Sequence, residues 1–188
     1  VTDQWLSKIL DRKLVMFPYI SVQQEFGYSD VTAINNTKHR VEKLFEKAEK
    51  TLHVINKIST YFADIKTDEH NSMSEDEISD FRISTHIIHL PERNERQKLY
   101  NSQFADRKEF NIASINACRH QKGAVGLWKS ICMAVSKAKK TNEDAVLICE
   151  DDHIFTEHYT KDSFVRKVYE AATYGAELLS GGIGGFGN

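Results

Sequence analysis

The stretch "DAVLICEDDHIF", residues 144–155, sets the fold class of this chain. Its first part is a run of apolar or small residues, Ala145 to Cys149, which is typical of a fully buried strand in a parallel sheet. The run leads directly into Glu150, Asp151 and Asp152. Adjacent carboxylates repel one another, and burying them is costly unless a positive charge lies nearby. The stretch therefore predicts a buried strand that ends at an acidic site in need of a counter-charge.

Strands and helices alternate on both sides of this stretch. Patterning predicts strands over 83–90, 110–117, 144–150 and 176–182, and helices over 92–104, 123–140 and 161–175. Gly175 is the candidate C-cap of the last helix. This alternation predicts an α/β fold with a mostly parallel sheet flanked by helices. Ligands of such sheets bind at the carboxyl ends of the strands, so we expect "HLPERNER" and "CEDDH" to face one cleft.

The chain before residue 84 is patterned differently. Apolar residues recur at helical spacing over 37–62, which predicts a long amphipathic helix. The next stretch, "ADIKTDEHNSMSEDEISD", is polar and acidic. We therefore predict an amino-terminal segment, 1–62, a linker, 63–83, and an α/β unit, 84–188.

Composition excludes several classes of protein. The 188 residues include 25 Lys and Arg and 27 Asp and Glu, so the formal charge is 25 − 27 = −2, and no basic field favours nucleic acid as a partner. No apolar run reaches the roughly 18 residues that predict a transmembrane segment. Cys118, Cys132 and Cys149 are odd in number and widely spaced, which indicates reduced thiols and a cytoplasmic location.

The acidic triplet has two interpretations. Glu150 and Asp152 are alternate residues, so in strand geometry their side chains project to the same side and can share Mg²⁺ or Mn²⁺. The alternative is a solvated acidic turn, or one paired with a Lys. The glycine-rich "SGGIGGFGN", residues 180–188, lacks a phosphate-loop signature, and is either a flexible loop or a close backbone approach to a ligand.

Three motifs in order resemble glycosyltransferase family 25. They are "HIIHLPERNERQ", "GAVGLWKSI" and "AVLICEDDHIF", which are similar to the family's "INLP..ERR", "GxxGCxxSH" and "EDD" patterns. The resemblance implies a GT-A fold, a nucleotide-sugar donor such as a UDP-sugar, and a saccharide acceptor. It further implies transfer with inversion, as in lipopolysaccharide or surface-glycan synthesis. The acidic triplet takes the place of the family's DxD motif.

The resemblance also suggests a role for each candidate site residue. Mn²⁺ or Mg²⁺ is expected at Glu150 and Asp152. The residues expected to contact the donor are Arg93, Arg96, Asp151, Gly181 and Gly182. For the two arginines, solvated charge at a helix start is the alternative. Asp3 is the candidate base that removes the proton of the acceptor hydroxyl.

Two features depart from the family pattern. Residues 1–62, with "FPYISVQQEFGYSDVT", resemble the carboxy-terminal end of the same domain, so the chain is either a fragment of a tandem transferase, which we favour, or a permuted domain. Ile131 stands where the family has the histidine of "SH", which puts activity in doubt. A non-catalytic sugar-nucleotide or scaffold module is therefore an alternative. A metal-dependent phosphohydrolase is a weaker one, because this chain has no second cluster of ligands.

Overall fold

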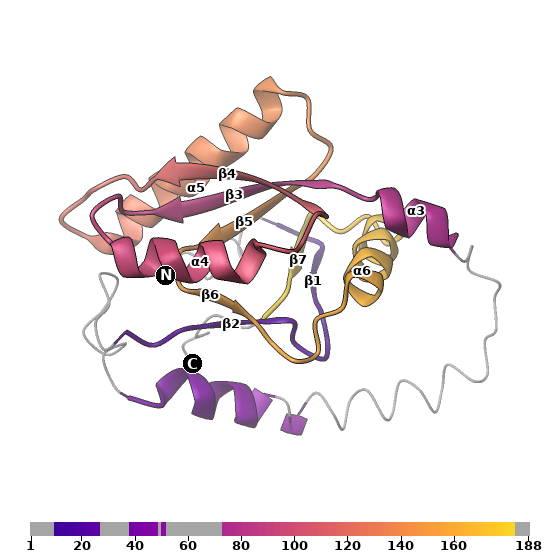
Figure 1. The fold of residues 1–188 in the computed structure, drawn as a ribbon, viewed down its shortest axis with the longest axis horizontal. Coiled ribbons are helices and arrows are strands. Elements are labelled where there is room, and N and C mark those ends of the chain that lie inside the picture. The colour runs from indigo at the N-terminus through magenta and orange to yellow at the C-terminus, as the bar shows by residue number, and fades with distance from the viewer. Residues whose placement is uncertain (1–9, 27–37, 49, 52–72, 183–188) are drawn as a thin grey trace.

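The computed structural model of the protein describes residues 10–26, 38–48, 50–51 and 73–182. Within these ranges the chain forms a mixed α/β fold, in which small sheets are flanked by helices (Figure 1). The labelled helices are α3 (Glu75–Asp80), α4 (Asn94–Phe104), α5 (Gly123–Lys140) and α6 (Lys161–Thr173). The strands are β1 (Lys13–Val15), β2 (Ser21–Gln23), β3 (Ile83–His89), β4 (Phe110–Asn116), β5 (Val146–Glu150), β6 (His153–Phe155) and β7 (Leu178–Ser180).

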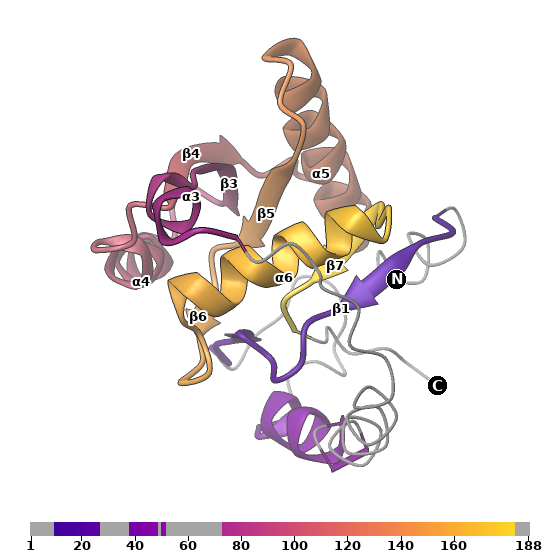
Figure 2. The ribbon, with the colours of Figure 1, turned by 90° about the vertical axis from the view of Figure 1, so that its right-hand side faces the viewer.

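The largest sheet in the described part of the chain has the order β4-β3-β5, with all strands parallel. The central strand β3 is buried along almost its whole length, and its buried residues include the polar Thr85, His86 and His89. Helix α5 packs on one face through Ala134, next to Ile88 and Ile115, and α4 packs on the other through Tyr100 and Phe104. Figure 2 shows these two helices on opposite sides of the sheet. The predicted parallel α/β sheet is confirmed.

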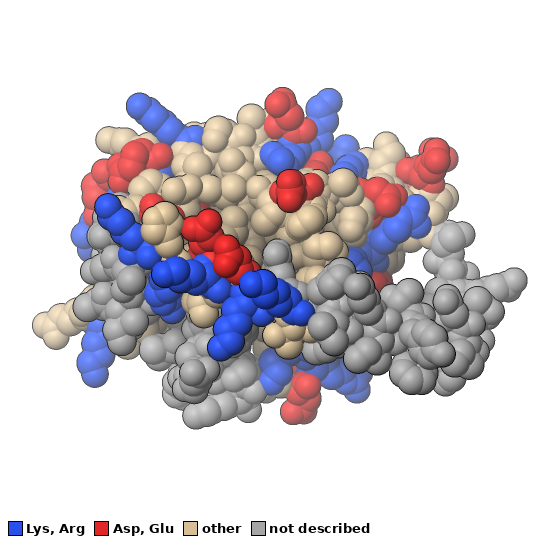
Figure 3. Space-filling model, turned by 90° about the horizontal axis from the view of Figure 1, so that it is seen from below, with Lys and Arg blue, Asp and Glu red and all other residues tan. Residues whose placement is uncertain are grey.

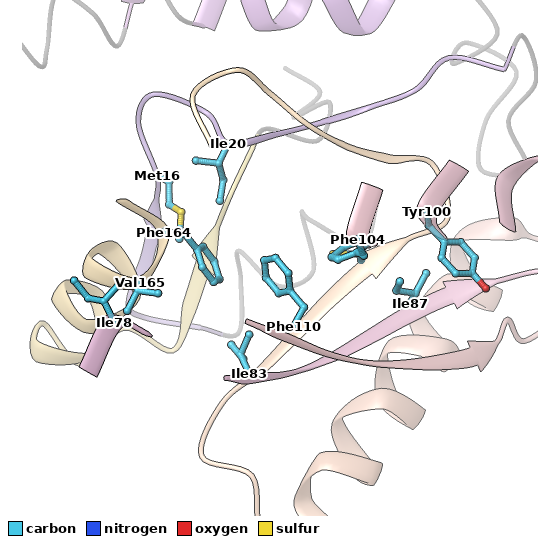
Figure 4. Packing of buried hydrophobic residues seen from close by; sticks show 11 residues of the cluster. Met16, Ile20, Ile78, Ile83, Ile87, Tyr100, Phe104, Phe110, Phe164 and Val165 are labelled. Carbon is cyan, nitrogen blue, oxygen red and sulfur yellow. The ribbon is translucent and has the colours of Figure 1, made fainter. Parts of the chain in front are cut away.

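The amino-terminal segment belongs to the same packed body. Strand β1 pairs in parallel with β7, and β2 pairs antiparallel with β6. Met16 and Ile20 lie in one hydrophobic core with Ile83 and Phe164 (Figure 4). The described residues of 1–62 and 84–188 therefore do not form separate units in this chain, because each buries apolar surface of the other.

The linker prediction for 63–83 is wrong over its last residues. Residues 75–80 form α3, which Ser74 and Glu77 begin as a capping box: the Ser74 hydroxyl accepts from Glu77 N at 3.2 Å, and the Glu77 carboxylate accepts from Ser74 N at 2.8 Å. Ile78 of this helix is buried in the main core, and β3 begins at Ile83. Residues 63–72 lie outside the described ranges. Helix α3, which has one core residue, was not predicted because the composition of this stretch is acidic.

The remaining helix predictions hold where the structure describes them. Residues 40–48 and 50–51 of the predicted long helix are helical, and the Glu25 carboxylate accepts from the backbone N–H groups of His39 at 2.6 Å and Val41 at 2.7 Å at its start. Helix α6 ends before Gly175, which has φ = 65° and is the residue predicted to cap it. No helix in the described residues is long and apolar enough to cross a bilayer. All three cysteines are free thiols.

Candidate functional site

A cleft of about 1320 Å³ opens at the carboxyl edge of the β4-β3-β5 sheet. Its walls include residues that directly follow β3, β4 and β5, because the register pairs Ile88 with Glu150 and His89 with Asn116 and so brings the three strand ends together. The other wall comes from the amino-terminal segment, through residues 22–26 and 38–42. The prediction that "HLPERNER" and "CEDDH" face one cleft is confirmed.

The carboxylates of this cleft have a counter-charge from the protein itself. Arg96, on α4, donates from Nη1 to Asp151 Oδ1 at 2.7 Å and to Asp152 Oδ2 at 3.3 Å. The side chains of all three residues are at most 15% exposed, so little water screens these ion pairs. Arg96 was predicted to contact a donor. It lines the cleft, but its guanidinium is engaged with the two aspartates.

The amino-terminal segment holds this ion-pair cluster from the other side. The Phe26 ring lies over the Arg96 guanidinium, with 4.5 Å between the guanidinium carbon and the ring centroid. Gln24 N donates to the main-chain carbonyl of Asp152 at 2.7 Å. The position of the acidic triplet therefore depends on residues that are more than a hundred positions away in the sequence.

Asp152 has the electrostatics of a binding group. Burial raises the pKa of its carboxyl to about 6; the Arg96 guanidinium opposes this rise and the Asp151 carboxylate adds to it. Oδ2 accepts from Arg96, whereas Oδ1 is buried and has no hydrogen-bond partner among the described residues. A buried carboxylate oxygen without a partner is costly, and a cation or a donor group of a ligand would relieve that cost.

Two carboxylates of the cleft, those of Glu150 and Asp152, are suited to bind one divalent cation. Glu150, Asp151 and Asp152 all line the cleft, and the unpartnered Oδ1 of Asp152 is a suitable oxygen ligand. Asp151, held by Arg96 at 2.7 Å, is less available. Within the described residues, no three His, Cys, Asp or Glu side chains are already gathered as a metal site. A cation bound by Glu150 and Asp152 would therefore complete its coordination with ligand oxygens or water.

The rim of the cleft carries both basic and acidic residues, and sequence reasoning missed some of the basic ones. Arg93, a predicted donor contact, lines the cleft after β3. Arg119 and His120 line it after β4, and Arg119 forms an ion pair with Glu92. Viewed from the side of the helix at residues 40–48, basic and acidic side chains lie next to one another on the surface (Figure 3). Arg119 and His120 directly follow a predicted parallel strand, and this place was the signal that could have identified them.

The "GAVGLWKSI" motif anchors the loop that carries these two residues. Ser130 is fully buried; its hydroxyl accepts from Cys118 N at 2.8 Å and donates to Gly126 O at 2.9 Å. A Cβ at Gly126 would lie 2.4 Å from Cys118 O, so only glycine lets the helix approach the loop this closely. Ile131 packs against the cluster of Ile88 and Ile115. In this chain the motif residues have structural roles.

The glycine pair that was predicted to contact the donor lies elsewhere. Gly181 and Gly182 are not among the described residues that line the cleft. A Cβ at Gly182 would lie 2.3 Å from Ser21 O, and Gly181 O accepts from Ile20 N at 2.9 Å and from Ser21 N at 3.1 Å. The close approach predicted for this glycine pair is therefore to the protein's own β2 segment. Asp3 lies outside the described residues.

Comparison with known proteins identified no relative of this chain. No family model, curated protein or solved structure matches this chain.

Proposed function

We propose that this chain forms a cation-dependent glycosyltransferase site, which moves a sugar from a nucleotide-sugar donor, such as a UDP-sugar, to a saccharide acceptor. The observation that carries the proposal is the acidic triplet, Glu150 to Asp152, in a cleft at the carboxyl edge of a parallel sheet. An acidic turn directly after a parallel strand is also what the family 25 motifs imply. A GT-A fold, a cytoplasmic location and a role in surface-glycan or lipopolysaccharide synthesis are parts of this proposal.

Charge determines the role of each residue in the proposed reaction. Departure of the nucleotide diphosphate builds negative charge on its oxygens, and Mn²⁺ or Mg²⁺ held by Glu150 and Asp152 would supply the positive charge that offsets it. Arg93 and Arg119, on the rim, are placed to attract the phosphates before they reach the acidic end of the cleft. Asp151 keeps Arg96 in place. Asp3 is proposed as the base on the resemblance alone.

Calorimetric titration of UDP tests the proposal. We expect binding in Mn²⁺ that is lost in EDTA, and loss of both binding and sugar transfer in Asp152→Asn, which keeps the side-chain size but removes the anionic ligand. Glu92→Gln is a matched control, because Glu92 lines the same cleft but lies outside the triplet. Equal UDP affinity in EDTA and in Mn²⁺ would contradict the cation assignment.

A non-catalytic sugar-nucleotide module is the second candidate, and Ile131 favours it. Its side chain packs with Ile88 and Ile115, so no histidine reaches the site from this position. UDP binding without transfer, measured on the full chain with a range of nucleotide-sugars, would favour this module over the transferase.

A further inference from the structure

The protein itself supplies part of the positive charge that the triplet needs. Arg96 is 6% exposed and reaches two of the three carboxylates, so the cluster is partly compensated before any ligand arrives. Three carboxylates and one guanidinium give a formal charge of 1 − 3 = −2. A second cation entering the cleft is therefore attracted by the remaining charge but repelled by Arg96.

The surroundings of Arg96 restrict it to this position. Nη1 of its guanidinium donates to both Asp151 and Asp152, so this one nitrogen lies between the two carboxylates. The Phe26 ring covers it at 4.5 Å. A guanidinium held between two carboxylates and an aromatic ring does not withdraw freely when a competing cation approaches.

We propose that Arg96 is a built-in counter-cation, a positioning residue that holds Asp151 and Asp152 in place in the cation-free protein and weakens the binding of a divalent cation to Glu150 and Asp152. The inference rests on the cation site of the proposed function. It assigns to Arg96 a role opposite to that of a metal-supporting residue, because removing Arg96 strengthens cation binding.

Removal of this guanidinium has two opposite consequences. Without Arg96 the buried carboxylates lose their partner, so the cation-free protein becomes less stable. The same loss removes the repulsion against Mn²⁺, so the affinity for Mn²⁺ rises by about tenfold. General damage to the site would lower both stability and affinity, and the rise in affinity therefore separates the proposed role from a structural one.

The experiment measures Mn²⁺ binding without nucleotide, by calorimetry and by electron paramagnetic resonance, on the full chain. A pH about two units above the pKa of Asp152 keeps its carboxyl ionised. Arg96→Met should bind Mn²⁺ about tenfold more tightly than the wild type, and its melting temperature should rise more on addition of Mn²⁺. Arg96→Lys, which keeps the charge, should bind like the wild type within about threefold.

Two further variants complete the design. Lys38→Met removes an exposed cation of the same cleft and should leave Mn²⁺ affinity within about threefold of the wild type. Phe26→Leu removes the aromatic ring that covers the Arg96 guanidinium and should raise the affinity for Mn²⁺ by about threefold. If Arg96→Met does not fold even with Mn²⁺, Phe26→Leu decides the question alone.

The outcomes separate this inference from the proposed function. Mn²⁺ binding to Arg96→Met that is equal to or weaker than binding to the wild type overturns the counter-cation role and leaves the cation site intact. Unchanged affinity in Phe26→Leu does the same where Arg96→Met is unfolded. Absence of Mn²⁺ binding in every variant, the wild type included, overturns the cation site and the role of Arg96 together.

Discussion

Asp152→Asn should stabilise the cation-free protein. The pKa of the Asp152 carboxyl is raised from 3.8 to about 6 by burial, and each pKa unit corresponds to about 1.4 kcal/mol. Ionised Asp152 therefore costs the folded protein up to about 3 kcal/mol relative to the unfolded chain near neutral pH. Asparagine has nearly the same shape and no charge. We expect it to raise the free energy of unfolding by about 1–3 kcal/mol in EDTA.

The pH dependence gives the sign of the effect. Between about pH 4 and pH 6 folded Asp152 holds a proton that unfolded Asp152 has released, so the stability contributed by this group falls as pH rises through that window. The advantage of Asp152→Asn should therefore appear near pH 7 and disappear near pH 4. Urea unfolding of both proteins at the two pH values measures it.

Asp151→Asn is the matched control. This carboxylate accepts the shorter bond from Arg96, at 2.7 Å, and only 4% of the residue is exposed. Its loss removes the shorter of the two printed ion pairs of a buried guanidinium, so we expect a loss of several kcal/mol. The reasoning is refuted if Asp152→Asn destabilises the protein near pH 7 in EDTA, or if its effect does not change between pH 4 and pH 7.

Two further changes test the packing that surrounds the site. Gly126→Ala places a Cβ 2.4 Å from Cys118 O and should lower the free energy of unfolding in urea by about 2 kcal/mol or more. Ser130→Ala removes a hydrogen bond to the same loop and should lower it by about 1–3 kcal/mol. An unchanged free energy of unfolding in Gly126→Ala would mean that α5 does not approach this loop. Ile78→Ala should lower the free energy of unfolding by about 2–4 kcal/mol, and the exposed control Ser79→Ala should leave it almost unchanged. Equal melting temperatures of the two variants would restore the linker interpretation of α3.

Local patterns predicted most of the α/β elements. The apolar run before Glu150 predicted β5, and the stretch "ISTHIIHL" at 83–90 predicted the central strand. The expectation that the run before Glu150 is fully buried holds only for Cys149, because β5 lies at the edge of the three-stranded sheet. Gly175 was predicted to end α6 and does so with a positive φ. Helix α3 was missed because its acidic composition outweighed its capping box, Ser74 with Glu77, and its single buried residue.

The sequence by itself determined that Glu150, Asp151 and Asp152 follow an apolar strand and need a positive charge, because adjacency along the chain and apolar patterning are local properties. Only the tertiary structure decided that Arg96 supplies this charge, that Phe26 covers it, and that Gly181 and Gly182 approach Ser21 rather than a ligand. Each of these contacts joins residues at least 55 positions apart. Such partners are chosen by how the strands pair and the core packs, and no spacing in the sequence records that choice.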